Sequence, residues 1–124
     1  MLPFQIKICG LTNVDDTRWA CQCGADAIGL NFYSKSKRFV DSDRATAIAD
    51  EIDRVNHRQE GETNVRKIRV LKVGVFVEMP VIDLLEIADR HSLDGIQLHG
   101  DEEPSVVQEI RSGLSKNGQD CFLI

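Results

Sequence analysis

The stretch QIKICGLTN, residues 5–13, joins a short strand to the start of a helix. Isoleucine occupies alternate positions at Ile6 and Ile8, which predicts a strand with one apolar face. Gly10 ends that strand, and the Thr-Asn pair that follows can cap a helix whose first turn is acidic. A strand that leads directly into a helix is the unit from which parallel α/β sheets are built.

The same order of elements repeats along the chain. Strand-like apolar runs begin near Gln5, Ala27, Leu71, Gly95 and Cys121. Helices are predicted for residues 13–24, from Asp41 or Ser42 to about Arg54, after Pro80, and within the segment DEEPSVVQEI that begins at Asp101. Alternating strands and helices predict a parallel α/β sheet whose strands lie in sequential order.

Two further patterns refine this organisation. The segments ADAIGLNF, residues 25–32, and LDGIQLHG, residues 93–100, share an Asp-small-Ile-x-Leu core, which indicates an internal repeat. Residues 56–67 are polar, with no apolar period and nothing to anchor them. We therefore predict an exposed and mobile loop there.

Alternation within the strands separates two faces of the predicted sheet. One apolar set is expected to pack under the helices: Ile6, Ile8, Ile28, Leu30, Phe32, Val73, Val75, Val77, Ile96 and Leu98. The other set is expected to face the interior of a barrel: Lys7, Cys9, Gly29, Asn31, Gly74, Phe76, Gln97 and His99. The carboxyl ends of parallel strands meet at one rim, so Cys9, Asn31 and His99 are predicted to converge there.

The composition excludes several classes of protein. The 124 residues carry a formal net charge of -5, with 15 Lys and Arg scattered among 20 acids, which argues against a nucleic-acid partner. No apolar run approaches the roughly 20 residues that a membrane-spanning helix needs, and the N-terminus lacks a signal-peptide pattern. We therefore expect a cytoplasmic chain without a membrane partner.

The four cysteines fit that compartment. They form no C-x-x-C pair, and Cys21 and Cys23 project about 200° apart on the predicted helix. We expect neither a zinc site nor a disulfide from that pair, and interpret both residues as small packing side chains.

Four segments carry a more specific signal. They are KICGLTNVDD, GADAIGLNFYSKSKRFV, KVGVFV and DGIQLHGDE, and they lie in this order within residues 6–103. Together they resemble phosphoribosylanthranilate isomerase, the aldose–ketose isomerase of tryptophan biosynthesis. The resemblance implies a (β/α)8 TIM barrel as the fold class. Residues 1–124 would form the N-terminal part of this single domain, an incomplete barrel of about four βα units plus the start of a fifth strand.

The resemblance also implies an Amadori rearrangement that needs no metal or organic cofactor. A general acid opens the ribose ring, a base removes the proton at C2, and the product is a ketose; the resemblance assigns the base to Cys9. A nearby cation lowers the pKa of a thiol, and Lys7 shares the strand face, so we expect Lys7 to tune Cys9. The alternatives are a lysine satisfied in a polar interior and a cysteine that is buried and inert.

The expected substrate is a phosphorylated sugar joined to anthranilate. By resemblance, Arg38 in YSKSKR meets the anthranilate carboxylate, which a guanidinium binds in two-point geometry. Asn31, Gln97 and His99 match positions that line the substrate pocket. Alternatively, YSKSKR is a solvated basic loop, and His99 caps the following helix or hydrogen-bonds in the rim.

The resemblance places the general acid and the phosphate-binding loops outside these residues. The family's general acid is an aspartate on the sixth strand, and glycine-rich loops after the seventh and eighth strands hold the phosphate. We therefore expect this chain to be inactive alone and to self-associate through open sheet edges. Two other functions stay open: another phosphate-handling TIM-barrel isomerase, and a non-catalytic half-barrel.

Overall fold

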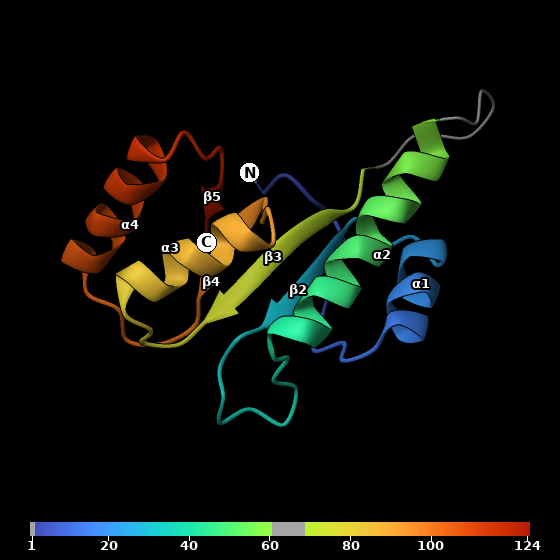
Figure 1. Cartoon of the computed structure of the whole chain (residues 1–124), viewed down its shortest axis with the longest axis horizontal. Coiled ribbons are helices and arrows are strands. Elements are labelled where there is room, and N and C mark those ends of the chain that lie inside the picture. Colours follow the sequence, from blue (N-terminus) through green and yellow to red (C-terminus); the bar gives the residue numbers. More distant parts are fainter. Residues whose placement is uncertain (1, 61–68) are drawn as a thin grey trace.

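The computed structural model describes residues 2–60 and 69–124, without the side chains of residues 59 and 60. The described residues form a parallel sheet in the order β1-β2-β3-β4-β5 (Figure 1). The strands are β1 (Lys7–Cys9), β2 (Ala27–Asn31), β3 (Leu71–Phe76), β4 (Gly95–Leu98) and β5 (Phe122–Leu123). The helices are α1 (Val14–Gln22), α2 (Ser42–Glu60), α3 (Val81–Arg90) and α4 (Pro104–Lys116). The predicted fold class, four βα units of a barrel and a short fifth strand, is confirmed.

The helices begin where the sequence places their starts. The Asn13 side chain caps α1 by accepting a hydrogen bond from the Asp16 N–H at 2.8 Å. Pro80 precedes α3, and Pro104 occupies the first turn of α4, where its missing N–H costs nothing.

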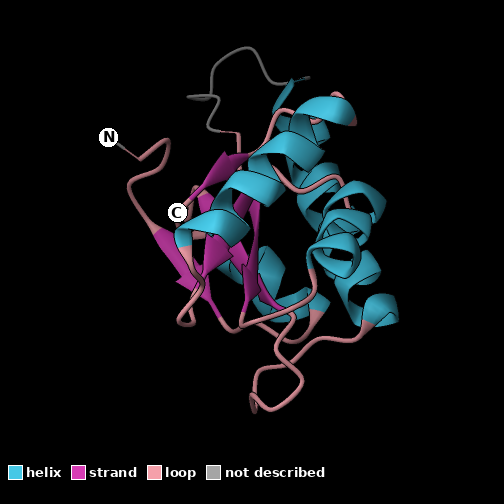
Figure 2. Cartoon of the chain, turned by 90° about the vertical axis from the view of Figure 1, so that its left-hand side faces the viewer, coloured by secondary structure: helices cyan, strands magenta, loops and turns pink. Residues whose placement is uncertain are grey.

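The helices pack against one face of the sheet (Figure 2). Buried residues of strands and helices form one apolar cluster, which includes Ile28, Leu30, Phe76, Ile96, Ile48, Leu84 and Ile110. The opposite face carries Lys7, Cys9 and Gln97, so the sheet separates an apolar layer from a face with functional groups. Lys7 of β1 donates a hydrogen bond to Gln97 of β4 across two intervening strands, which shows that this second face is concave.

The predicted faces of β3 are wrong. Paired residues of parallel strands share a face, and Gly74 pairs with Leu30 and Ile96, which both lie in the apolar cluster. Val75 pairs with Asn31 and Gln97 on the concave face. Val73 and Val75 therefore face the interior, whereas Gly74 and Phe76 lie under the helices. The helix side of β3 also carries Lys72, which pairs with Ile28, so the more apolar set of this strand does not mark the helix side.

The buried Lys72 belongs to the helix side of β3. Its side chain is covered by the helices, and its ammonium donates a hydrogen bond to the Asp53 carboxylate of α2 at 2.8 Å. A lysine is tolerated there because its stem packs among apolar residues and its charge has a partner.

Helix α2 is longer than predicted. It continues to Glu60 instead of ending near Arg54. Asn56 anchors this last part, because its Nδ2 donates to the Val70 carbonyl at 3.0 Å and its Oδ1 accepts from the Val70 N–H at 2.8 Å. The prediction of an unanchored loop is therefore wrong for residues 56–60, and its remainder, 61–67, lies outside the described residues.

The internal repeat corresponds to a structural device at the amino ends of the strands. Asp26, just before β2, accepts hydrogen bonds from the Gln5 and Ile6 N–H groups at 2.9 and 2.8 Å. Asp94, just before β4, accepts one from the Lys72 N–H at 2.9 Å. Each aspartate thus ties its own strand to the start of the preceding strand, and the repeat is a structural one.

The outermost strands are only partly covered. Ile6 and Ile8, predicted to pack under the helices, are 51% and 37% exposed. At the other edge Phe122 is half-buried, with its ring 6.2 Å from that of Phe4, and Ile124 is exposed. The fifth strand is as short as predicted, although Phe122 has more cover than expected.

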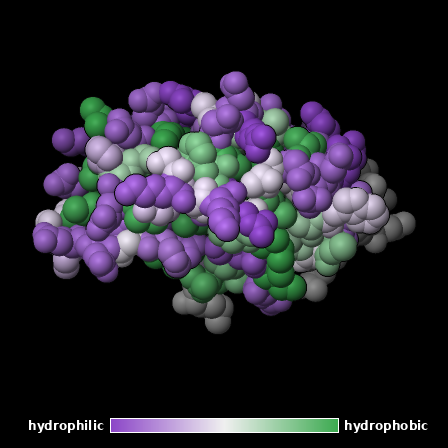
Figure 3. All heavy atoms as spheres, turned by 90° about the horizontal axis from the view of Figure 1, so that it is seen from below, coloured by the Kyte–Doolittle hydropathy of each residue, from purple (hydrophilic) through white to green (hydrophobic). Residues whose placement is uncertain are grey.

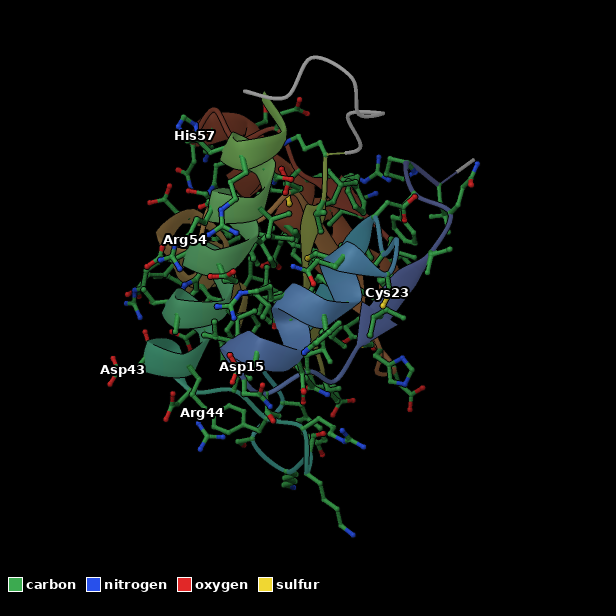
Figure 4. All side chains as sticks on the ribbon, turned by 90° about the vertical axis from the view of Figure 1, so that its right-hand side faces the viewer. Asp15, Cys23, Asp43, Arg44, Arg54 and His57 are labelled. Carbon is green, nitrogen blue, oxygen red and sulfur yellow. The ribbon has the colours of Figure 1, made fainter. Side chains whose placement is uncertain are left out.

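The four cysteines are free thiols. Cys21 is buried in the core, whereas Cys23 is exposed at the end of α1, so the packing interpretation fails for Cys23 (Figure 4).

Within the described ranges, no helix is long and apolar enough to cross a membrane. The same ranges hold no group of three His, Cys, Asp or Glu residues that could bind a metal ion.

Candidate active site

The carboxyl ends of the strands bring the predicted site residues to one edge. Cys9 ends β1 and pairs with Gly29, while Asn31 ends β2. His99 follows β4, and its N–H donates to the Phe76 carbonyl at the end of β3 at 2.9 Å. The prediction that Cys9, Asn31 and His99 share one end of the sheet is confirmed. Figure 3 shows this lower edge of Figure 1, where hydrophilic side chains surround apolar patches.

Gly29 creates the space that the Cys9 thiol occupies. A Cβ atom on Gly29 would lie 2.7 Å from the Cys9 Sγ, closer than real contacts allow. Cys9 is exposed on the concave face, so the buried and inert interpretation is wrong for it. Sequence reasoning did not assign Gly29 a role, although a glycine inside a strand often marks a close approach.

Gly10 shapes the turn after β1 and holds Arg38 beside it. Its φ of +82° lies in the left-handed region that favours glycine, and a Cβ there would lie 3.2 Å from the Arg38 Cγ. The Arg38 Nη1 donates to the Gly10 carbonyl at 3.4 Å. The guanidinium of the loop after β2 thereby comes to the end of the strand that carries Cys9.

Asn31 organises the loop that carries Arg38. Its Oδ1 accepts from the Tyr33 N–H at 2.9 Å, and its Nδ2 donates to the Ser36 Oγ at 3.2 Å. Ser36 in turn accepts from the Arg38 N–H at 3.1 Å. Among the described residues the bond to Ser36 is the one donation that the Asn31 amide makes, so its second N–H is available to a ligand. Ser36 was not foreseen, because a serine in a basic loop gives no distinct signal.

Lys7 and Gln97 meet in the concave interior. The Lys7 Nζ donates to the Gln97 Oε1 at 2.5 Å, and both residues are half-buried. This contact agrees with the interpretation of Lys7 as a lysine satisfied in a polar interior. Its influence on Cys9 stays a prediction.

The rim near His99 is built from acidic side chains. Glu102 accepts hydrogen bonds from the N–H groups of Gly100 and Glu78, both at 3.0 Å. Glu78 has a φ of +48°, a strained value for a residue with a side chain. The N-cap of α4 is Glu103, so the suggestion that His99 caps this helix is wrong. The exposed imidazole is available at the rim.

A thiol, a guanidinium and hydrogen-bonding side chains at the carboxyl ends of parallel strands form the type of site that (β/α)-barrel enzymes carry. The thiol can act as a proton acceptor or nucleophile, and Arg38 can bind an anion. The fold and the arrangement of these side chains therefore place the chain in the (β/α)-barrel class.

Comparison with known proteins gives the family. Residues 6–119 match the family described as N-(5'phosphoribosyl)anthranilate (PRA) isomerase, and the chain belongs to this family. A relative named N-(5'-phosphoribosyl)anthranilate isomerase from Thermotoga neapolitana is 39% identical over 110 residues, 89% of this chain and 47% of the relative. One from Rubrobacter xylanophilus is 38% identical over 109 residues, 88% of this chain and 46% of the relative.

Solved structures agree with these relatives. Phosphoribosyl anthranilate isomerase from Thermotoga maritima matches with a TM-score of 0.71 at 33% identity, over 88% of this chain and 46% of that one. A phosphoribosyl anthranilate isomerase in complex with reduced 1-(o-carboxyphenylamino)-1-deoxyribulose 5-phosphate matches with a TM-score of 0.70 at 32% identity, over 88% and 49%. The chain spans about half the length of the relatives it matches.

Proposed function

We propose that this chain supplies the proton-abstracting half of a phosphoribosylanthranilate isomerase, within one barrel domain. The reaction converts N-(5-phosphoribosyl)anthranilate, an aminoaldose, into the carboxyphenylamino-deoxyribulose phosphate, a ketose. The observation that carries this proposal is the exposed Cys9 thiol at the end of β1, in the space that Gly29 leaves, with Arg38 beside it.

Cys9 acts as the base in this proposal. Its thiolate takes the proton from C2 of the opened sugar, the electron pair forms an enol, and protonation at C1 gives the ketose. The thiol suits this step because it stands exposed at the concave face, where substrate can reach it. The role of Lys7 is to place a positive charge on the same strand face, which favours the thiolate.

The other site residues hold the substrate. Arg38 binds the anthranilate carboxylate, since the loop around Asn31 and Ser36 fixes its backbone. The free N–H of Asn31, the amide of Gln97 and the imidazole of His99 orient the amine and hydroxyl groups. The general acid and the phosphate site come from the rest of the barrel, so residues 1–124 alone should turn over almost no substrate.

Complementation tests this proposal. The chain is combined with the complementary segment of the Thermotoga maritima relative, complex formation is verified by sedimentation, and ketose formation is followed. Turnover should appear in the complex and be absent from either segment alone. A well-formed complex that shows no turnover would contradict the proposal. Turnover of a different phosphorylated aldose would favour another barrel isomerase.

We further infer that the isolated chain self-associates and that it works in the cytoplasm with a small-molecule substrate. The exposed Ile6, just before β1, and Ile8, within β1, support the association, since apolar side chains beside an open strand edge favour contact with another copy. Sedimentation velocity should show concentration-dependent dimers, and Ile8→Lys should weaken them. A chain that stays monomeric at all accessible concentrations contradicts this inference.

A further inference from the structure

The backbone of the loop after β2 holds Ser36 in a fixed position. The Ser36 N–H donates to the Tyr33 carbonyl at 3.0 Å, and the Ser36 carbonyl accepts from the Phe39 N–H at 3.2 Å. The Val40 N–H donates to the Asn31 carbonyl at 2.9 Å and closes the loop. The half-buried Ser36 side chain therefore starts from an ordered backbone at the carboxyl end of the sheet.

The Ser36 hydroxyl has a proton that the loop does not use. Its Oγ accepts hydrogen bonds from the Asn31 Nδ2 at 3.2 Å and from the Arg38 N–H at 3.1 Å. The direction of the first bond is fixed, because the Asn31 Oδ1 already accepts from the Tyr33 N–H. A hydroxyl has two acceptor lone pairs and one donor proton. Both acceptor positions of Ser36 are thus occupied, and its O–H donates to no group among the described residues.

This unused donor lies near the Arg38 guanidinium. The Ser36 Oγ is bonded to Asn31, the last residue of β2, whereas the Arg38 Nη1 is bonded to the Gly10 carbonyl, just after β1. These two strands are neighbours, and neighbouring strands lie about 4.8 Å apart, so the two donors are roughly one strand spacing apart. Hydrogen bonds to oxygen are about 2.8 Å long. One carboxylate placed between the two donors therefore reaches both of them.

The charges of the rim favour an anionic group at this loop. Lys35, Lys37 and Arg38 are exposed on it. The rim after β3 and β4 carries acidic side chains instead, at Glu78 and at residues 101–103. A carboxylate is attracted to the first side and repelled by the second.

We propose that Ser36 is a specificity-determining residue of the site: its hydroxyl donates a hydrogen bond to one oxygen of the substrate carboxylate, and Arg38 binds the other oxygen. This inference rests on the proposed function, which supplies a substrate with an anthranilate group. Ser36 then contacts the substrate directly, in addition to holding the loop, and selects for a substrate that carries a carboxylate.

Anthranilate and aniline are matched probes, because both have an aromatic amine and only anthranilate has a carboxylate. Each is titrated into the isotope-labelled 124-residue chain, and NMR shifts are followed. Anthranilate should bind saturably, with shifts centred on Ser36 and Arg38, and about tenfold more weakly in Ser36→Ala, which loses a hydrogen bond to a charged group. Aniline binding should not change. Ser34→Ala, at an exposed serine of the same loop, is the control and should bind anthranilate like the parent chain.

Two results of these titrations would overturn the proposal. They are equal anthranilate affinity in folded Ser36→Ala and the parent chain, and absence of saturable anthranilate binding near Ser36. If Ser36→Ala does not fold, the signals of Ser36 in the unmodified chain decide: a shift with anthranilate and none with aniline supports the contact, and equal responses overturn it.

A double-mutant cycle separates direct contact from positioning of Arg38. The ratio kcat/KM of the complemented enzyme is measured for Ser36→Ala, for Arg38→Ala and for both changes together. A direct contact predicts that Ser36→Ala lowers kcat/KM several-fold even when Arg38 is already alanine, mainly through a higher KM. No further loss in the double variant would show that Ser36 acts only through Arg38, and would overturn the proposal. If the well-formed complex shows no turnover, the proposed function fails, and the anthranilate titration alone decides the role of Ser36.

Discussion

The two ends of the sheet use their side chains in opposite ways. At the amino ends, the carboxylates of Asp26 and Asp94 accept hydrogen bonds from the backbone of neighbouring strands and thereby hold the strands together. At the carboxyl ends, Gly10 and Gly29 have no side chains that would crowd Arg38 and the Cys9 thiol, and the thiol is exposed.

This difference separates stability from chemistry within one parallel sheet. An aspartate whose carboxylate is held by backbone N–H groups of a neighbouring strand contributes to folding. A thiol in a space made by glycine contributes little to packing and is free to react. Substitutions at the amino ends should therefore change stability, and those at the carboxyl ends should change rate.

Thiol reactivity should show the largest contrast. Cys121 lies before β5 at the amino ends, and burial, together with the negative charges of Asp94 and Asp120, raises the pKa of its thiol to about 11. At pH 8, Cys121 should react with iodoacetamide about 100-fold more slowly than the exposed Cys23, because its thiolate fraction is that much smaller. Cys9 should react at least as fast as Cys23. Mass spectrometry of time points measures all three, and comparable rates at Cys9 and Cys121 would contradict the contrast.

Asp94→Ala should destabilise the chain by about 2 kcal/mol, which is roughly 30-fold in the folding equilibrium. The reason is that the N–H of buried Lys72 loses its acceptor, and Arg69 loses the carboxylate to which it donates at 2.7 Å. Urea unfolding measures the change. Asp101→Ala, at an exposed position, is the control. A loss of stability in Asp94→Ala no larger than in the control would show that the hydrogen bonds to Asp94 contribute nothing.

Gly29→Ala should reduce kcat of the complemented enzyme by about tenfold, because the new methyl group displaces the Cys9 sulfur from its position. Gly118→Ala serves as the contrasting control. At Gly118 the φ is +65° and nothing lies within 4 Å, so alanine should lower stability through backbone strain and leave the rate unchanged. Equal rates in Gly29→Ala and the parent enzyme would mean that the close approach has no chemical role.

Lowering the pH should produce the smallest effect, a loss of stability through the buried carboxylate of Glu51, which lies between α1 and α2. A hydrogen bond from Arg18 at 2.9 Å lowers the pKa of Glu51, and the charges of Arg18 and Arg54 act in the same direction. A carboxyl whose pKa is lowered on folding adds stability above its unfolded pKa, and this stability is lost as the pH falls below about 4. Glu51→Gln should flatten that decline by up to about 1 kcal/mol.

The control for this effect is Asp15→Asn, since Asp15 is an exposed partner of Arg18 at 3.3 Å. Figure 4 shows Asp15 at the start of α1 beside α2. Unfolding midpoints measured between neutral and acidic pH should keep their slope in this variant. An identical slope in Glu51→Gln would exclude the buried carboxylate as the source.

Local signals in the sequence were sufficient for much of this architecture. The Asn13 cap and the proline before α3 depend on neighbouring residues alone, so both were predictable. The convergence of Cys9, Asn31 and His99 followed from the parallel order of the strands. The helix starts thus depend on residues that lie close together in the chain, whereas the convergence needs only the order of the strands and helices.

Features set by distant contacts were not predictable from local patterns. The extension of α2 depends on hydrogen bonds between Asn56 and Val70, which no residue period reveals. The faces of β3 depend on which side the helices cover, because valine fills positions on the concave side as well. The role of Gly29 depends on the shape of the space around the Cys9 sulfur, which only the folded sheet defines.

The most direct test compares Cys9→Ser with Asp94→Ala in the complemented enzyme, measuring kcat and the free energy of unfolding for both. Cys9→Ser should lose at least about 100-fold in kcat, since a hydroxyl ionises too weakly to replace a thiolate, with unfolding little changed. Asp94→Ala should lose stability and keep kcat within a few-fold of the parent value. Near-normal kcat in Cys9→Ser, or a rate loss in Asp94→Ala as large as in Cys9→Ser, would contradict the division of the sheet into a structural end and a chemical end.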